Sequence, residues 1–164
     1  MSDSNTERWM AGPVENVPPL LQPVAHALLQ ADKEIHELMN GLPEGKMWDK
    51  LNEMASVGFH LQHIKGFLDR LFTYARAETL SEEQFTYLKN EGVPTDEDVL
   101  KAMHEQVLQS VSALADFDET RLTEFRGVGR KQLPSTVIGL LFHSAEHMMR
   151  HTGQLHVTVR CLRK

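Results

Sequence analysis

Apolar residues recur every three or four positions along most of this chain, which is the spacing of an amphipathic α-helix. The pattern predicts long helices over residues 20–39, 56–76, 95–114 and 135–162, and a capping box at Ser81 predicts a short additional helix. Each long segment has one apolar face, which must be buried against a neighbour. The predicted fold is therefore all-α, a four-helix bundle with one short extra helix.

The segments between the predicted helices contain no run of alternating apolar and polar residues and no Asn-Gly turn, so no β-strand is predicted. Residues 43–54 are predicted to form a loop anchored by Trp48, and residues 117–134 a second loop. Residues 1–15 are expected to form an N-terminal arm. No internal repeat divides the chain, so residues 1–164 are expected to form a single bundle domain.

The second predicted helix has two distinct faces. Its core face consists of apolar residues at helical spacing, namely Val57, Leu61, Ile64, Leu68 and Leu71. Its opposite face, which is expected to contact water, consists of polar residues, namely Gln62, Lys65, Asp69, Thr73 and Arg76.

Composition excludes several classes of protein. With 164 residues, 41% of them apolar and 24% charged, the chain can bury a core without disulfides or structural metals. Its net charge of −6 argues against a nucleic-acid-binding surface, which needs a basic stripe. The single cysteine, Cys161, excludes an intramolecular disulfide and a thiolate-rich zinc site. Because no hydrophobic signal segment or membrane-spanning run is present, a soluble cytoplasmic protein without a membrane partner is expected.

Three histidines at four-residue intervals, His143, His147 and His151, lie in the last predicted helix. Side chains from successive turns of a helix lie close together, so two such imidazoles can bind one metal ion. Relative to the apolar stripe of this helix, His147 and His151 form the better pair, and His143 is rotated towards solvent. Gln154 projects to the same side, where its amide can bond a ligand or bound water.

Two histidines from one helix require a third ligand from elsewhere, and the second helix offers His60 and His63. Periodicity does not choose between them. His60 lies nearer the core stripe, whereas His63 shares its flank with Ser56, Phe67 and Tyr74, which would form the wall of a pocket. From spacing alone, a histidine pair on one helix can be a metal site or simply two half-buried polar residues. Both interpretations stay open.

The other histidines are given no role. His26, His36 and His104 are isolated on their predicted helices and are expected to lie at solvated edges, and His156 lies at the edge of the last apolar stripe. The zinc-protease motif HExxH is absent, because the glutamate within 143–147 is at the wrong position, so no general base is assigned.

Two stretches resemble the signature regions of the DinB-like superfamily: SVGFHLQHI at 56–64 and LPSTVIGLLFHSAEHMMRHTGQL at 133–155. The specific feature is a His-Ile on the second helix, combined with HxxxH followed by x-Gly-Gln on the last. The first predicted helix, in GPVENVPPLLQPVAHALL, also matches, so the resemblance covers essentially the whole chain. It implies an up-down-down-up four-helix bundle, often a homodimer, in which three histidines bind a divalent metal ion.

Matched position by position, the resemblance implies that His63, His147 and His151 are the metal ligands. His60 and His143 match no ligand of the family and remain candidates for contacting the ligands or lining the rim of a pocket. The metal is expected to be zinc or nickel, with iron as a further candidate.

The function that the resemblance implies is enzymatic. Some relatives are transferases or isomerases that use low-molecular-weight thiols such as bacillithiol, mycothiol or glutathione. We therefore expect a metal-dependent enzyme that activates a small thiol or water for S-transfer to, or hydrolysis of, a small-molecule substrate. The alternative is a non-catalytic, stress-related helical dimer or a metal-binding protein.

Overall fold

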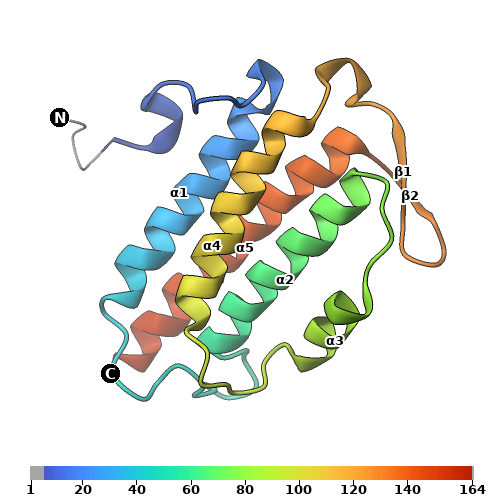
Figure 1. The fold of residues 1–164 in the computed structure, drawn as a ribbon. Helices are drawn as coiled ribbons and strands as arrows, with labels where there is room; N and C mark the ends of the chain where they lie inside the picture. Colours follow the sequence, from blue (N-terminus) through green and yellow to red (C-terminus); the bar gives the residue numbers. More distant parts are fainter. Residues whose placement is uncertain (1–5, 164) are drawn as a thin grey trace.

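Four long helices packed side by side make up most of the computed structural model, which describes residues 6–163 (Figure 1). They are α1 (Gln22–Met39), α2 (Val57–Ala75), α4 (Val99–Ala113) and α5 (Val137–Leu162). α1 and α5 run in one direction, and α2 and α4 run in the other (Figure 1). Both α5 and α4 pack against α1 and α2. This confirms the expected helical bundle and its up-down-down-up course.

The core lies between these four helices and consists of the predicted apolar stripes. Its largest fully buried side chains include Leu28 and Ile35 of α1, Leu61 and Leu68 of α2, Met103 of α4, and Leu141, Met148 and Leu155 of α5. Full burial of such a side chain contributes about 1.5–3 kcal/mol. Packing of these stripes therefore fixes the order in which the helices neighbour one another.

α2 begins at a polar cap that is itself buried. The hydroxyl of Ser56 accepts a hydrogen bond from the main-chain N–H of Phe59 at 3.1 Å. Behind this cap the ring of Trp48 lies against Gly58, where a Cβ atom would overlap it. The loop before α2 is thus anchored by Trp48, and only glycine permits this close approach.

Replacing Ser56 by alanine is expected to lower the free energy of unfolding by about 1 kcal/mol, because the N–H of Phe59 loses its acceptor. Ser56→Gly is the matched control, since glycine at a helix cap costs only a few tenths of a kcal/mol. Urea denaturation of both variants measures the difference. Equal losses for the two variants would contradict the capping role.

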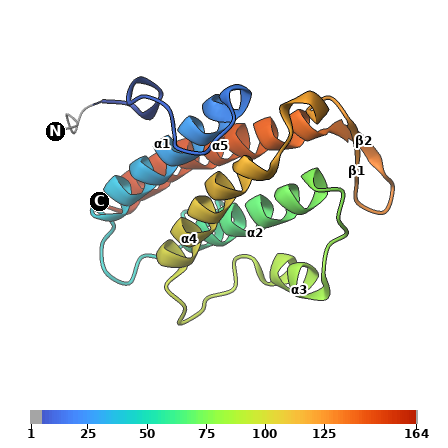
Figure 2. The same cartoon turned by 45° about the horizontal axis from the view of Figure 1, so that its top comes forward.

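A short helix, α3 (Glu82–Asn90), covers one side of α2 on the way to α4 (Figure 2). Its capping box is present, with Ser81 and Gln84 bonded to each other's main chain. After α3, the amide of Gln62 on α2 accepts a hydrogen bond from Gly92 N–H (2.7 Å) and donates one to Val93 O (3.1 Å). This segment is therefore clamped onto α2.

The clamp overturns part of the prediction for the polar face of α2. Gln62 and Thr73 were expected to contact water, but they are buried, with only 7% and 5% of their surface exposed. The hydroxyl of Thr73 and the carboxylate of Asp69 both accept hydrogen bonds from Gln84 Nε2 of α3. Helical periodicity distinguishes polar from apolar faces but does not show which polar face a later connection covers.

The prediction that no strand is present is wrong. An antiparallel hairpin of β1 (Phe125–Val128) and β2 (Leu133–Thr136) lies between α4 and α5; it occupies the end of the segment predicted as a loop and extends to Thr136, which was predicted as part of the last helix or its cap. Its strands are short and contain no fully buried residue, so they lack the alternation that marks a half-buried strand. The hairpin leads directly into Thr136, whose hydroxyl accepts a hydrogen bond from Gly139 N–H and caps α5.

The described part of the N-terminal arm lies against α1. The main-chain N–H of Arg8 donates to Gln30 Oε1 at 3.0 Å, and Nε2 of His26 is 2.9 Å from Gly12 O. Residues 1–5 of the predicted arm lie outside the described residues. Between residues 6 and 163, no helix combines the length and the apolar character needed to cross a bilayer.

Candidate metal centre

Three imidazoles from two helices meet where α2 packs against α5. Nε2 of His147 lies 3.2 Å from Nε2 of His63 and 3.2 Å from Nε2 of His151. These residues form the three-histidine group, whose ligand atoms all lie within 4.8 Å of one another. His147 and His151 are on successive turns of α5, and His63 faces them from α2.

Aromatic side chains of α2 hold the imidazoles in place. Phe59 stacks on His63 with ring centroids 5.4 Å apart, and Phe67 contacts His147 edge-to-face at 4.6 Å. These residues are one turn before and one turn after His63, so the helical repeat puts all three rings on one flank. The flank predicted as a pocket wall thus packs against the three-histidine group.

A buried carboxylate fixes the orientation of His63. Oε2 of Glu91 is 2.6 Å from Nδ1 of His63, and Oε1 accepts a hydrogen bond from Arg70 Nη1 at 2.7 Å. Since an ionised carboxylate only accepts hydrogen bonds, Nδ1 of His63 carries the proton. The lone pair of His63 is therefore on Nε2 and points into the group, as metal ligation requires.

Glycine at position 66 allows this arrangement. A Cβ atom there would overlap Oε1 of Glu91 and lie 2.6 Å from Nη1 of Arg70. Sequence reasoning missed both Glu91, which is 28 residues from His63, and Arg70, which lies two turns beyond His63 on α2. The available signal was Gly66 itself, because glycine inside a helix costs about 1 kcal/mol and often marks a close approach.

His60 contacts the group without joining it. Its Nδ1 lies 2.8 Å from Nδ1 of His151, and the residue is 5% exposed. With Nε2 of His151 directed at the other ligands, Nδ1–H of His151 donates to His60. His60 therefore orients a ligand in the same way that Glu91 orients His63.

Burial keeps these rings neutral. Burial first, and the nearby His63 second, lower the pKa of His60 to about 4 and that of His151 to about 3. The pKa of His147 is also lowered, first by burial and then by His63. A metal ligand must be unprotonated, so at neutral pH His147 and His151 are ready to bind a cation, and His60 beside them adds no competing charge.

The same shifts predict that chelator-treated protein loses stability in mild acid. An unfolded histidine has a pKa near 6.5. As the pH falls from about 6.5 towards 4, the unfolded chain binds protons that His60 and His151 in the folded protein do not bind. The free energy of unfolding therefore decreases across this window and is fully restored above pH 6.5.

Urea midpoints at pH 7 and pH 4.5 measure this loss. His151→Gln, which removes the titrating ring, should show a smaller difference between the two midpoints. An equal difference in the variant and the unchanged protein would contradict the assignment.

His143 lies at the rim of the group. Its ring centroid is 5.1 Å from that of His147, and its Nδ1 is 2.6 Å from Glu146. His143, Glu146 and His147 also form a candidate ligand set. However, Glu146 already accepts a hydrogen bond from Arg150 at 2.6 Å, and this set is more exposed than the three-histidine group.

Gln154 lies beside the group and not in it. Together with His60 it lines a cavity of about 340 Å³, whose other walls are Met54, Ala55, Val157 and Thr158. His60, which lines this cavity, also contacts His151 of the three-histidine group.

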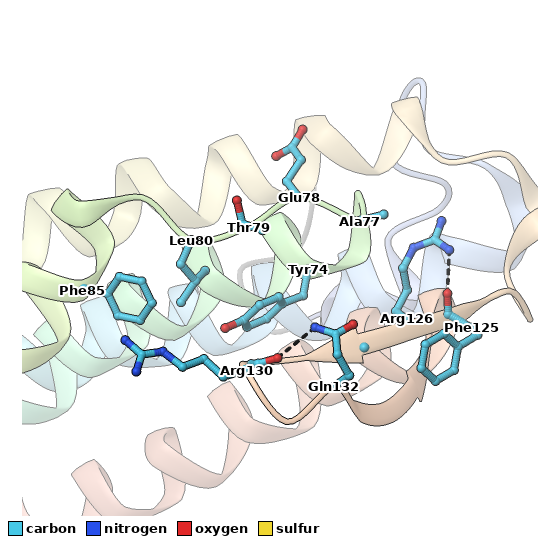
Figure 3. A pocket seen from close by; sticks show the side chains of 12 residues that line it. Tyr74, Ala77, Glu78, Thr79, Leu80, Phe85, Phe125, Arg126, Arg130 and Gln132 are labelled. Atoms are coloured by element: carbon cyan, nitrogen blue, oxygen red, sulfur yellow. Dashed lines mark hydrogen bonds between the residues drawn. The ribbon is translucent and has the colours of Figure 1, made fainter.

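Tyr74 lies far from the three-histidine group. It is eleven residues beyond His63, which is three turns and about 16 Å along the helix. There it lines a separate cavity of about 510 Å³ with Phe85 and the hairpin residues Arg126 and Arg130 (Figure 3). Tyr74 was predicted to share a flank of α2 with His63 and to form the wall of a pocket there. It lies too far along the helix to line the wall beside the histidines.

His36 and His104 lie at half-exposed edges as predicted, with side chains 39% and 38% exposed, but they are not isolated in space. Nδ1 of His104 lies 2.9 Å from a carboxylate oxygen of Asp32, and the rings of His36 and His104 meet edge-to-face at 4.9 Å. The two histidines are far apart in sequence, and only the packing of α1 against α4 brings them together. His156, by contrast, has one charged neighbour, Glu34, at 3.6 Å.

Comparison with known proteins agrees with the fold and the motif. The sequence pattern of the DinB superfamily matches residues 5–155, a span that contains all of the three-histidine group. No curated protein matches this chain. Because the match extends over most of its length, the chain belongs to the DinB superfamily.

Proposed function

We propose that this protein is a metal-dependent enzyme. In this proposal, His63, His147 and His151 hold a divalent ion, zinc or nickel, or else iron, and the site activates a small thiol or water. The reaction is S-transfer to a small electrophile or its hydrolysis. The observation that carries the proposal is the meeting of three Nε2 atoms from two helices.

The hydrogen-bond chemistry of the group fits a cation. Nε2 of His63 is an acceptor, because Nδ1 donates to Glu91. A neutral His147 has at most one proton on Nε2, so it cannot donate to both His63 and His151. At least one of the two 3.2 Å contacts therefore lacks a hydrogen bond, and a positive ion bound by all three nitrogens would remove this mismatch.

Three neutral imidazoles leave a bound divalent ion its full charge and at least one open position, which lowers the pKa of a thiol or water there. Glu91 increases the basicity of His63 and keeps its ring aligned. His60 does the same for His151 and has its second nitrogen available for a substrate. No separate protein base is needed to generate the nucleophile.

The cavity beside His60 supports a small substrate with apolar character. Met54, Ala55 and Val157 supply apolar walls, and His60 and Gln154 supply hydrogen-bonding groups at one side. This combination of an apolar wall with a few polar groups is typical of small-molecule sites.

A direct test is the loss of 1-chloro-2,4-dinitrobenzene in the presence of glutathione or cysteine, using zinc- and nickel-loaded protein. A carbon–sulfur bond forms, chloride leaves, and the thiol proton passes to solvent. We expect the loaded protein to accelerate this loss over loaded His63→Ala. Omitting the thiol and assaying ester hydrolysis tests water as the nucleophile.

Metal analysis separates the two parts of the proposal. If the unchanged protein binds one ion at the three-histidine group but accelerates neither reaction over His63→Ala, the non-catalytic alternative holds. If it binds no ion there, the whole proposal fails.

A further inference from the structure

A second cluster of metal-ligand side chains lies on the other side of the bundle, where α1 packs against α4. Asp32 and His36 are one turn apart on α1 and project from the same face. His104 meets them from α4. The ligand atoms of these three residues all lie within 4.8 Å of one another.

The separations are close to those that one ion imposes. Nδ1 of His104 lies 3.0 and 2.9 Å from the two carboxylate oxygens of Asp32, and Nδ1 of His36 lies 3.4 Å from Oδ1. A tetrahedral ion with bonds of about 2.0–2.2 Å keeps its ligand atoms roughly 3.3–3.5 Å apart. Small side-chain movements therefore suffice to place all three donors around one ion.

The three residues of this cluster differ in how far their side chains are exposed to solvent. The side chain of Asp32 is 11% exposed, whereas those of His36 and His104 are 39% and 38% exposed. A buried carboxylate must be compensated by hydrogen bonds or opposite charge. The half-exposed rings leave the outer side open, so an ion can enter from solvent and keep a water ligand.

We propose that Asp32, His36 and His104 form a second site for a zinc-class divalent ion, which joins α1 to α4. One carboxylate and two imidazoles suit zinc and its neighbours in the first transition row. Nδ1 of His36 is also 2.9 Å from the main-chain oxygen of Asp32. In the metal-free protein Nδ1–H donates this bond, and on metal binding the ring changes to the tautomer with its proton on Nε2, which leaves the Nδ1 lone pair for the ion.

The competing explanation is purely structural. In it, Nδ1–H of His104 donates to Asp32 and ties the two helices together without an ion. Both explanations predict that loss of His104 weakens the α1–α4 contact. They differ over His36. A zinc site needs His36 as a ligand, whereas the hydrogen bond between His104 and Asp32 does not involve it.

Zinc binding by the double variant His63→Ala/His147→Ala tests the proposal, because this variant lacks the three-histidine group. Calorimetric titration should show one zinc ion per chain. His36→Ala and Asp32→Asn, each added to the double variant, should lower that affinity by about tenfold or more. Zinc should also raise the melting temperature of the double variant, and His36→Ala should abolish that shift.

The matched control is His156→Ala in the same background. His156 and Glu34 form a comparably exposed pair that lacks a third ligand, so its loss should leave zinc binding unchanged. If the double variant binds no zinc, or if His36→Ala and Asp32→Asn leave its affinity unchanged, the proposal is overturned and the cluster is only a helix-to-helix contact. Neither result bears on the three-histidine group, which is absent from these variants.

Discussion

Replacing His63 by alanine is expected to weaken zinc binding at the three-histidine group by more than the roughly 10–100-fold that loss of an outer hydrogen-bond partner costs. His63 supplies the only ligand from α2, so the remaining pair on α5 can chelate but cannot enclose the ion. Calorimetric titration in a His104→Ala background, which disables the second cluster, isolates this site. Circular dichroism should show an unchanged helical content.

His143→Ala is the control for this experiment. His143 lies next to His147 but belongs to the more exposed candidate set, so its removal should leave the affinity within a few-fold of the starting protein. The opposite pattern, with zinc binding lost in His143→Ala and retained in His63→Ala, would move the site to His143, Glu146 and His147.

Glu91→Gln is expected to lower zinc affinity by roughly 10–100-fold, although Glu91 is not a ligand. If the amide nitrogen of glutamine faces His63, it donates to Nδ1 and forces the proton onto Nε2, the atom that must bind the ion. If the amide oxygen faces His63, the amide nitrogen opposes Arg70, and two donors meet. Either orientation works against the tautomer that ligation requires.

Titration of Glu91→Gln with zinc in the His104→Ala background measures this effect. The matched control is Glu97→Gln. Glu97 is an exposed carboxylate 4.0 Å from Lys65, and it lies in the same connection between α3 and α4 as Glu91. This variant should bind zinc with unchanged affinity. An unchanged affinity in Glu91→Gln would show that packing alone aligns His63.

Local spacing predicted much of this fold. The four long helices, the caps at Ser56 and Ser81, and the pairing of His147 with His151 all follow from repeats of three to four residues. Such repeats depend only on helix geometry, so they can be read within a single segment. The hairpin was not predicted because Gly127 and Pro134 interrupt any alternation in its short strands.

Spacing did not choose between His60 and His63, and the family resemblance selected His63. In the structure, both residues contact the histidines of α5. His63 joins the two histidines of α5, while His60 bonds the far nitrogen of His151. The difference between them depends on how α2 is rotated against α5, which residues of one helix do not encode by themselves.

The sequence by itself determined which segments are helical and which faces of those helices are apolar, because both depend on neighbours within a few residues. Only the tertiary structure brought Glu91 to His63 and to Arg70, and Asp32 to His104. These contacts join residues that are 21 to 72 positions apart. They depend on the path of the connection between α3 and α4 and on the packing of α1 against α4. Both are decided by burial across the whole chain.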